Sequence, residues 1–576
     1  MMMSVKNNLF LLFVLILFII CVSCSDKDIT GPKITGLIPS IASVYPNEGA
    51  IGTELTIIGT NFETGASVFV EEIKSNQVEV ASATTIYATV PPGIPVNTAL
   101  SVMVKNQGGG SATLTNVFTA IPPVLFYINS ATKPSGNIGS TVILEGKAFG
   151  DNKNTGKVLF SDGTGGTIEA VFASVEDWTD NFIISTVPAG TKDGPVFVQT
   201  ELGNSDSVTF KVTEAAIFSP STINWTLAQE LPNGVSGHKS IFVVIDKENS
   251  SDNYIYVSGG RDATATSLTQ MLYARVNNDG TLNQWAETTP LPEALSFHSI
   301  ASATPYNAKI TGNGYIYILG GINSSGDANS KIYKTALNPD GTMGPWSETT
   351  PLLKTLHSSG AVIFRNNIYV VGGATTAGNT SNIPVNTVYK STIGENGELG
   401  EWSELSPLAN ARSHHGLVSF GGYLYVCGGE KDTVSVDIGS LGTSGGLSSV
   451  EYGKINLRTG IIDSWAETSP MGKNRSKHTT LIAGGNIFVS SGLYSGLTGM
   501  VQGSSENIYA VIYSDGTIGS FNGATGSNTL FTSGGSNLFN QTGISYIDAS
   551  GKAHVVIIGG AKVGSPSTKL RKVLFY

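Results

Sequence analysis

The histidines of this chain are regularly spaced, and this spacing could bring their side chains together in a chemically active site. Four histidines follow a tryptophan by 13 residues and a fifth follows its tryptophan by 11: His238, His298, His415, His478 and His357. One imidazole per repeat could form a ring, and imidazoles bind transition metals. The alternative is packing between repeats, which we favour because a wide central channel would hold the imidazoles too far apart to share an ion. We therefore predict no metal site and no cofactor.

Two of these histidines have an arginine three residues before them. Arg412 precedes His415 in "ARSHH", and Arg475 precedes His478 in "NRSKH". Arginine pairs with carboxylates and hydrogen-bonds to hydroxyl groups, so these four residues are candidates for ligand binding. Trp178, between acids in "VEDWTDNF", is a fifth candidate, because an indole can stack on a sugar ring. Packing is the alternative for Trp178 and for the arginines.

Catalytic motifs are absent from the sequence. Neither a phosphate-binding loop nor a nucleophile elbow occurs. Cys427 lies inside the apolar run "YLYVCGG", which indicates a small buried residue rather than a reactive thiol. The segment "DNKNTG" at 151–156 lacks the spacing and the final Glu of a calcium loop, so we expect a turn. We predict no catalytic residue, and a non-enzyme is the favoured interpretation.

The elements that would position these side chains are repeats of about sixty residues. The motif "DGTLNQWAETTPLP" from Asp279 has close relatives that begin at Asp340, Asn396 and Thr459. Apolar runs ending in a glycine pair recur, and they end at Gly260, Gly321, Gly373, Gly429, Gly560 and, in a degenerate copy, Gly492. An aromatic residue recurs in step, as Trp225, Trp285, Trp346, Trp402, Trp465 and Phe521. Four short strands per repeat are typical of a propeller blade.

Closure of the ring can also be predicted. We expect the strand before each Gly-Gly to be buried, Asp-Gly to form a type I′ turn, and each Trp to end the outer strand. The chain stops after "KLRKVLFY", a third strand with no fourth strand behind it. Trp225 conversely has no Gly-Gly before it. Residues 216–225 are therefore predicted to complete the last blade, which gives six blades.

Gly-Gly, then Tyr, then Trp at this spacing resembles the kelch repeat over residues 215–576. The resemblance implies a six-bladed kelch-like β-propeller, with the Trp-to-His crossovers and the loops after Gly-Gly on one face. Gly492 and Phe521 depart from the pattern, and the repeats are longer than the usual kelch unit. Related propellers include a copper oxidase, whose Cys–Tyr crosslink has no counterpart around Cys427, and mutarotases acting on sialic acid.

Two smaller β modules precede the propeller. Residues 37–120 and 121–214 share marks in the same order, since Gly59 and Phe62 correspond to Gly146 and Phe149 and both modules carry a Val-Pro. Short alternating runs between Gly, Pro and Asn predict strands of small sandwiches. The two modules resemble tandem IPT/TIG domains, which are immunoglobulin-like. The predicted fold class is thus all-β: two immunoglobulin-like sandwiches followed by a six-bladed kelch-like β-propeller.

The N-terminal sequence predicts the cellular location of the protein. Residues 1–23 combine Lys6 with an apolar run, Leu9–Val22, that is short for a membrane span and suits a signal peptide. "CVSC" places Ser23 before Cys24, which resembles a bacterial lipobox with Cys24 as the lipid attachment site, although Cys21 stands where Leu is usual. The acidic "SDKD" in the linker 24–36 resembles a surface-export signal of Bacteroidota lipoproteins. We expect an outer-membrane lipoprotein facing the cell exterior.

Composition narrows the function classes. The net charge of −10 without a basic patch argues against nucleic acid as a partner. The expected function is a non-enzymatic surface binder of a polysaccharide or oligosaccharide, with the sandwiches as stalk. The alternatives are a sugar epimerase or mutarotase of the kelch type and a protein-binding adhesin. The sequence does not identify the ligand, the oligomeric state or which module binds.

Overall fold

The computed structural model describes residues 36–575 with internal gaps, and all described regular elements are β-strands. The gaps are 129–133, 137, 152, 154, 173–176, 213–224, 247–251, 305–309, 311, 378–380, 433–445, 458, 496–500, 505, 514, 524–537, 548–552, 563–564 and 570–572. The signal peptide, Cys24 and almost all of the linker lie outside the described residues. The lipidation prediction is therefore untested.

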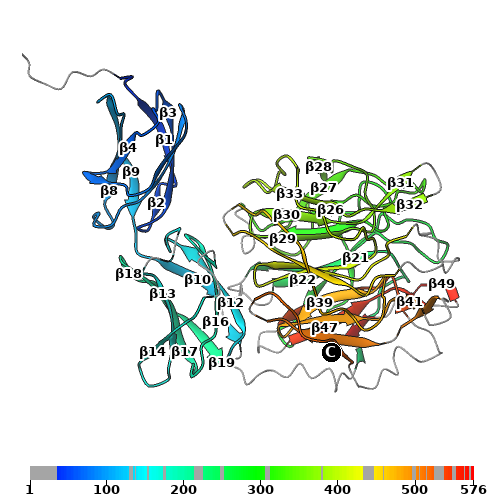
Figure 1. The fold of residues 1–576 in the computed structure, drawn as a ribbon. Helices are drawn as coiled ribbons and strands as arrows, with labels where there is room; N and C mark the ends of the chain where they lie inside the picture. The colour runs from blue at the N-terminus through cyan, green and yellow to red at the C-terminus, as the bar shows by residue number, and fades with distance from the viewer. Residues whose placement is uncertain are drawn as a thin grey trace, which may run out of the picture. The chain divides into compact units, whose positions relative to one another are not determined.

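The first sandwich consists of two β-sheets (Figure 1). One sheet has the order β1 (Ser40–Tyr45), β3 (Glu54–Thr60), β7 (Thr85–Thr89) and β6 (Val78–Ser82). The other has the order β2 (Glu48–Gly49), β9 (Ser111–Ala120), β8 (Ala99–Lys105), β4 (Ser67–Val70) and β5 (Ile73–Lys74). Side chains of a strand alternate between faces. Leu55 and Ile57 of β3 are accordingly buried, whereas Ile58 is exposed.

The second sandwich repeats this arrangement. One sheet has the order β10 (Val124–Ile128), β12 (Thr141–Lys147), β16 (Phe182–Thr186) and β15 (Trp178–Thr179). The other has the order β11 (Ser135–Gly136), β19 (Val208–Val212), β17 (Gly194–Thr200), β13 (Lys157–Ser161) and β14 (Thr167–Glu169), and β18 (Gly203–Asn204) pairs with β17. Val142, Leu144, Val158 and Phe160 meet between the sheets in one core. The all-β prediction is confirmed in both modules.

Six four-stranded sheets are present in the described part of residues 226–575, and they form the blades of a propeller. The first five, each in chain order, are β21 (Lys239–Asp246), β22 (Asp252–Ser258), β23 (Met271–Val276), β24 (Ala286–Glu287); β25 (Ser299–Ala303), β26 (Tyr315–Leu319), β27 (Ile332–Ala336), β28 (Ser347–Thr349); β29 (Gly360–Phe364), β30 (Asn367–Val371), β33 (Val388–Thr392), β34 (Ser403–Glu404); β35 (Gly416–Phe420), β36 (Tyr423–Cys427), β37 (Val450–Lys454), β38 (Ala466–Thr468); and β39 (Thr479–Ala483), β40 (Asn486–Ser490), β43 (Asn507–Val511), β44 (Asn522–Gly523). The first strands of neighbouring blades contact one another in a closed series and surround the axis.

The sixth blade closes the ring with strands from both ends of the domain. Its order is β46 (Thr542–Ile547), β47 (Ala553–Ile558), β50 (Val573–Phe575) and β20 (Thr226–Leu227). Thr226 pairs with Phe575 and Leu227 with Leu574. The closing strand thus follows Trp225 instead of ending at it. The other tryptophans likewise come directly before the first residue of their fourth strands, so the prediction that Trp ends the outer strand was wrong.

Short additional strands extend the loops after the glycine pairs. They are β31 (Ala374–Ala377) with β32 (Ser381–Pro384), β41 (Leu493–Ser495) with β42 (Val501–Gly503), and β48 (Ala561–Lys562) with β49 (Ser565–Lys569). β45 (Leu538–Phe539), in the crossover into blade six, pairs with β48. The crossovers between blades bridge to these loops, as Ser413 does to Glu430. We call the side of the propeller that carries crossovers and Gly-Gly loops the crossover face. The opposite side, with the turns after first and third strands, is the turn face.

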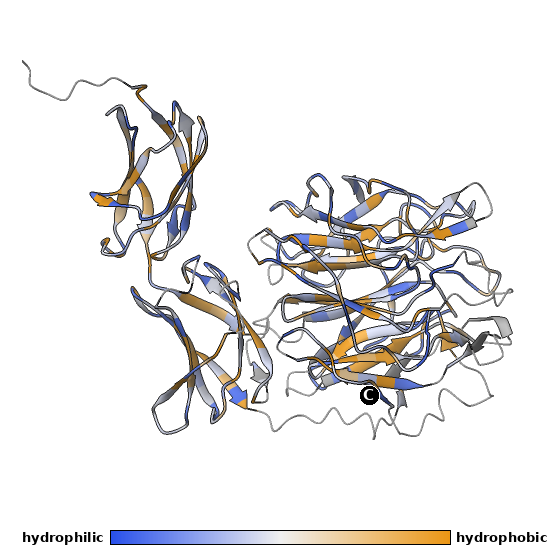
Figure 2. Ribbon diagram, in the orientation of Figure 1, coloured by the Kyte–Doolittle hydropathy of each residue, from blue (hydrophilic) through white to orange (hydrophobic). Residues whose placement is uncertain are grey.

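The repeated motif ties neighbouring blades together. Trp346 Nε1 donates to Thr289 O of the preceding blade at 3.1 Å, and Trp402 Nε1 donates to Thr350 O at 3.2 Å. Thr289 in turn donates from Oγ1 to Met343 O at 2.7 Å. The motif is therefore repeated because its Trp and the second residue of its Thr-Thr pair form the same interblade hydrogen bonds in successive blades. Apolar side chains of neighbouring blades pack together, as Tyr256 of blade one does with Ile316 and Ile318 of blade two. Figure 2 shows hydrophobic residues along the strands of the blades.

The turns between third and fourth strands differ from the prediction. A type I′ turn needs positive φ at both central residues. In "NNDGT", Gly280 has a φ of 82°, but Asp279 is not left-handed. The N–H of Gly280 donates to Asn277 O at 2.9 Å, and Asp279 Oδ1 accepts from Thr281. The type I′ prediction was therefore wrong, and the glycine occupies the single left-handed position of a longer turn.

The second sandwich packs against the turn face. Phe182 meets Phe364 edge to face with ring centroids 5.7 Å apart, and Ile184 belongs to the same buried cluster as Phe364. The Arg365 guanidinium lies 4.8 Å from the centroid of Phe182 and donates to Asn181 Oδ1 and Leu457 O. The contact surface on the sandwich is thus the outer side of β16.

Candidate functional site

The histidines that open the blades are wedges between them. A Cβ built on Gly559 would lie 2.5 Å from Cε1 of His238, and one built on Gly260 would lie 2.7 Å from Cβ of the same residue. The first glycine of a pair therefore makes room for the imidazole of the next blade, and the second makes room for the histidine of its own blade. The same contacts recur for His298, His415 and His478. In the degenerate copy, Ser491 replaces the first glycine, and the next blade carries Gln541.

These imidazoles are buried and neutral. Burial, assisted by the charge of Lys239, lowers the pKa of His238 and His298 to about 3. Burial and the neighbouring Arg475 likewise lower the pKa of His478 to about 3. Burial also lowers the pKa of His415 well below its usual value. Within the described residues, no three His, Cys, Asp or Glu side chains gather as a metal site.

The two arginine candidates are engaged by their own blades. Arg412 is fully buried; its Nη1 donates to Gly428 O at 2.8 Å and its Nη2 contacts the Glu451 carboxylate. Arg475 is 1% exposed and bonds to Ser491 O at 2.7 Å and to Glu506 Oε2 at 3.0 Å. Both guanidinium groups therefore serve as struts in this structure. The prediction that they bind ligand, with His415 and His478, is not tested directly.

Trp178 lies in the core of the second sandwich. Its side chain is 2% exposed, and Nε1 donates to Phe149 O at 3.0 Å. The rings of Phe149 and Phe172 stand at steep angles to the indole, with centroids 6.4 and 5.6 Å away. The indole thus has the packing role that was the alternative to sugar stacking. Cys427 is likewise buried, and burial raises the pKa of its thiol to about 12.

A ring of six backbone hydrogen bonds encircles the axis on the crossover face. The residue before each blade-opening position donates its N–H to the carbonyl of its counterpart in the preceding blade, at 2.7–3.1 Å. The six residues are Gly237, Phe297, Ser358, His414, Lys477 and Asn540, and all have φ between 50° and 64°. Left-handed backbone is unfavourable for non-glycine residues. The ring therefore imposes one backbone conformation on six different side chains.

Side chains of this ring converge with two residues that follow glycine pairs. We call Arg261, Phe297, His414, Glu430 and Lys477 the axial cluster. The Phe297 and His414 rings, from blades two and four, lie 5.6 Å apart, and the Arg261 guanidinium lies 5.1 Å from the Phe297 centroid. Blade three separates Phe297 from His414 along the chain, so the two rings meet across the axis.

An ion pair occupies one side of the axial cluster. Glu430 Oε1 lies 3.3 Å from Lys477 Nζ and accepts from Ser476 Oγ at 2.9 Å, and Oε2 lies 3.1 Å from His414 Nδ1. Burial raises the pKa of the Glu430 carboxyl, but Lys477 and His414 outweigh it and hold the pKa at about 2. Buried charges with perturbed pKa values are frequent at functional sites. Glu430 and Lys477 were absent from the sequence candidates.

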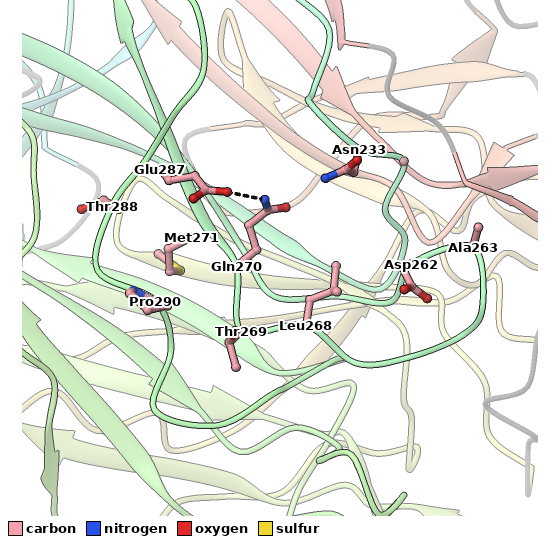
Figure 3. A pocket seen from close by; sticks show the side chains of 11 residues that line it. Asn233, Asp262, Ala263, Leu268, Thr269, Gln270, Met271, Glu287, Thr288 and Pro290 are labelled. Carbon is pink, nitrogen blue, oxygen red and sulfur yellow. Dashed lines mark hydrogen bonds between the residues drawn. The ribbon is translucent and has the colours of Figure 1, made fainter.

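A hollow of about 570 Å³ opens on the crossover face beside blade one. Figure 3 shows Asn233 and Asp262 on one side of it and Gln270 and Glu287 on the other. Gln270 Nε2 donates to Glu287 Oε1 at 3.1 Å. Leu268, Met271 and Pro290 add apolar surface. Small-molecule sites have volumes of about 300–1,000 Å³, and the volume of the hollow falls within that range.

Comparison with known proteins supports the modular fold. Residues 39–119 match the family model described as IPT/TIG domain. Kelch-like protein 40 of Xenopus laevis is 26% identical over 179 residues, covering 31% of this chain and 25% of the relative. Beta-scruin of Limulus polyphemus is 25% identical over 219 residues, covering 37% of this chain and 21% of the relative. The chain spans about a quarter of the length of these curated relatives.

Among solved structures, "Structure of YjhT" aligns with a TM-score of 0.43 at 12% identity and covers 60% of this chain and 96% of that chain. The fold and the relatives define an all-β protein with an IPT/TIG domain and a kelch-type propeller, which supports a binding or scaffold role. In the described residues, no helix has the length and hydropathy needed to cross a membrane.

Proposed function

We propose that this protein is an outer-membrane lipoprotein of the cell surface that binds a neutral oligosaccharide through the crossover face. The observation that carries the proposal is the hollow beside blade one. Its Asn233, Asp262, Gln270 and Glu287 side chains supply both donors and acceptors, which sugar hydroxyl groups require. Asp262 and Glu287 would repel an acidic sugar, so the favoured ligand carries no charge.

The scaffold of the hollow supports recognition. Its lining residues come from the crossover into blade one, from the loop after Gly260 and from the ends of β23 and β24. Loops held on a rigid framework commonly carry binding residues. A binding site with little backbone movement loses less entropy when a ligand binds. This placement favours a preformed sugar site.

A glycan array probed with the purified full-length protein tests the ligand class, followed by calorimetry with the strongest hit. Gln270→Ala and Glu287→Ala are expected to weaken binding at least tenfold, because each removes a polar contact worth about 1.5 kcal/mol. Glu348→Ala is the matched control, since Glu348 holds the position of Glu287 in blade two and pairs with Lys331 at 3.3 Å. Equal affinity in all three variants would remove the hollow as the site.

The proposed location in the outer membrane rests on the signal peptide and on Cys24. Acylation of Cys24 would tether the protein, so Cys24→Ala is expected to release it from the membrane fraction or to block maturation. Protease treatment of intact cells tests the exposed side, because a surface protein is cleaved without lysis. Retention of the Cys24→Ala variant in the membrane fraction, or full protection of the protein from protease in intact cells, would contradict this location.

The axial cluster favours a sugar epimerase or mutarotase as the second candidate. A neutral imidazole beside an ionised carboxylate, as His414 beside Glu430, can take and return a proton while the carboxylate stabilises the imidazolium. Exchange between the α and β anomers of candidate sugars, followed by NMR line shapes, tests this activity. Acceleration that is lost in Glu430→Gln would favour the enzyme over the binder.

A further inference from the structure

Two neighbouring members of the backbone ring on the crossover face bring a hydroxyl group and an imidazole together. The N–H of His414 donates to Ser358 O at 3.0 Å, which places these residues of blades four and three side by side. Their side chains also meet, because Ser358 Oγ lies 2.9 Å from His414 Nε2. The ring holds Ser358 at a left-handed φ of 53°. The backbone therefore fixes the hydroxyl group against the imidazole.

A carboxylate faces the opposite side of this imidazole. Glu430 Oε2 lies 3.1 Å from His414 Nδ1. The backbone of Glu430 is fixed as well, since its N–H and its carbonyl exchange hydrogen bonds with Ser413 at 2.8 and 2.9 Å. Ser358, His414 and Glu430 thus form a chain of hydroxyl, imidazole and carboxylate that uses both ring nitrogens. A nucleophile, a base within hydrogen-bond reach and a third group that orients the base define a nucleophilic triad on any fold.

The groups at the ends of this chain indicate where its protons lie. The Glu430 carboxylate is ionised, so it favours a proton on Nδ1 of His414 and leaves Nε2 as an acceptor for the Ser358 hydroxyl. His357 Nδ1 lies 3.0 Å from the same hydroxyl, and its Nε2 faces Asn382 Oδ1 at 2.9 Å. Burial lowers the pKa of His357 to about 3. Burial also lowers the pKa of His414, but Glu430 opposes this effect, so His414 is the base that a carboxylate supports.

We propose that the axis of the propeller carries an esterase site for esters of small acyl groups such as acetate, with Ser358 as nucleophile, His414 as general base and Glu430 as the residue that positions the base. Ser358 Oγ attacks the ester carbonyl and passes its proton to His414 Nε2. The imidazolium then protonates the leaving alcohol as the carbon–oxygen bond of the ester breaks. Water next attacks the acyl-serine, its proton passes through His414 to Ser358 Oγ, and the carboxylic acid is released.

The surroundings of the triad limit the substrate. Ser358 is 4% exposed, and Phe297, which is also 4% exposed, stands edge to face against His414. A narrow acyl group suits such a confined nucleophile better than a bulky one. Arg261, whose guanidinium lies 5.1 Å from the Phe297 centroid, supplies positive charge in the same cluster for the oxyanion of the transition state. The triad shares no residue with the hollow beside blade one, so the inference does not depend on sugar binding there.

A fluorophosphonate probe tests the nucleophile, because it bonds covalently to activated serines. We expect peptide mass spectrometry of the full-length protein to find the label on Ser358 in the wild type and in Ser391→Ala. Ser391 is the control because it is a buried serine of blade three whose hydroxyl donates to Gly400 O at 2.8 Å and not to an imidazole. Ser358→Gly should lose the label but keep the fold, since Gly237 adopts the same left-handed φ in the ring. Absence of the label from Ser358 in the wild type would overturn the proposal.

Hydrolysis of p-nitrophenyl acetate measures the activity itself. The rate should fall about 100-fold in Ser358→Gly and remain at the wild-type value in Ser391→Ala. Exchange of sugar anomers does not involve a serine nucleophile, so Ser358→Gly also separates this activity from a mutarotase. Equal hydrolysis by the wild type and Ser358→Gly would contradict the esterase.

The pH dependence of hydrolysis tests the positioning role of Glu430. Its carboxylate opposes the lowering of the His414 pKa by burial, so Glu430→Gln should move the acid limb of the rate profile to lower pH as well as reduce the rate. A reduced rate with an unchanged acid limb would contradict the contact of Glu430 with the base.

Discussion

The two faces of the propeller stabilise the ring in different ways. On the turn face, equivalent positions repeat the same residues: Gly280, Gly341 and Gly397 are all left-handed, and their carbonyls accept from tyrosine hydroxyls of the preceding blade at 2.5–2.8 Å. On the crossover face, the ring of backbone hydrogen bonds holds six different side chains in one conformation. Residue identity is therefore constrained at these turn positions, whereas it varies at the six ring positions of the crossover face.

This difference indicates where recognition can develop. The ring carries glycine, phenylalanine, serine, histidine, lysine and asparagine at equivalent places, so its backbone pattern tolerates different chemistry. The residues after the glycine pairs vary as well, from Arg261 to Glu430. A turn-face position filled by glycine for backbone reasons has no comparable freedom. Four predictions compare the faces.

The largest expected effect is acid sensitivity that originates on the crossover face. Burial lowers the pKa of His238, His298, His357 and His478 to about 3 in the folded protein. In the unfolded chain these groups titrate near pH 6.5. The unfolded state therefore binds more protons between these values, and stability falls as pH falls from about 6.5, by about 1.4 kcal/mol per pH unit for each imidazole.

Urea unfolding across this pH range measures the slope. His298→Gln should reduce the slope by the contribution of one proton, because it removes one titrating imidazole. Glutamine is chosen because Gln541 occupies the equivalent position of blade six. Equal slopes in the wild type and His298→Gln would contradict the assignment of a neutral imidazole at that position.

The next effect concerns charge. Glu430→Ala leaves Lys477 buried without its partner, and breaking such a pair costs about 3–5 kcal/mol. Its turn-face counterpart is Glu398→Ala, whose carboxylate is 50% exposed and lies 2.5 Å from Lys334 Nζ. Exposed pairs contribute about 1 kcal/mol or less. Free energies of unfolding should separate the two variants, and similar losses would show that the buried pair has no special importance.

Glycine substitution should destabilise the protein more on the turn face than on the crossover face, which is the reverse of the order expected for the charge variants. A Cβ on Gly341 of the turn face would lie 2.3 Å from Tyr254 Cε1, in addition to the left-handed φ of 81°. Gly341→Ala is expected to cost about 3 kcal/mol from strain and overpacking. On the crossover face, Gly326 has a φ of 87° but nothing within 4 Å of a new Cβ, so Gly326→Ala should cost only about 1 kcal/mol. Differential scanning calorimetry measures both changes.

The smallest effect concerns the sandwich that packs on the turn face. Arg365→Met keeps the alkyl stem but removes the cation over Phe182, an interaction worth about 1 kcal/mol. Unfolding in urea should show a modest loss of stability, with faster proteolysis between the second sandwich and the propeller. Lys331→Met is the control, since its ammonium lies over the ring of the buried Tyr333 in blade two and not over Phe182. Equal proteolysis of both variants would mean that Arg365 does not fix this contact.

The architecture could be predicted from the sequence because repetition makes it visible. Glycine pairs, Trp spacing and the orphan third strand predicted six blades closed by both ends of the domain, and the pairing of β20 with β50 confirms this closure, although the closing strand is Thr226–Leu227 and not the predicted 216–225. The turn type failed although a clue was present: Pro339 in "NPDG" favours position i+1 of a type I turn, and the hydrogen bond from Gly341 N–H to Asn338 O places Pro339 and Asp340 at the centre of the turn instead of Asp340 and Gly341. The period of the repeats revealed which residues are equivalent, but the turn depended on individual φ angles.

The axial cluster was missed because no residue type recurs at its positions. Phe297, His414 and Lys477 share a backbone conformation, which a pattern of residue types does not reveal. Glu430 and Arg261 become neighbours of that ring only when the blades close. Arg412 and Arg475 drew attention because they recur, and recurrence reflected their shared structural role in holding the blades together. In this repeat fold, a search for recurring residue types therefore finds the structural positions and misses a cluster formed by different residue types.

Closure through β20 and β50 also determines when the propeller can finish folding. The paired residues, Thr226 with Phe575, are separated by about 350 positions along the chain. During synthesis the first partner leaves the ribosome long before the second exists, so five blades can assemble while the sixth stays incomplete. Contacts of such sequence separation slow folding. The open edges at blades one and six are therefore exposed for the duration of synthesis, a period in which unpaired strand edges are prone to aggregation.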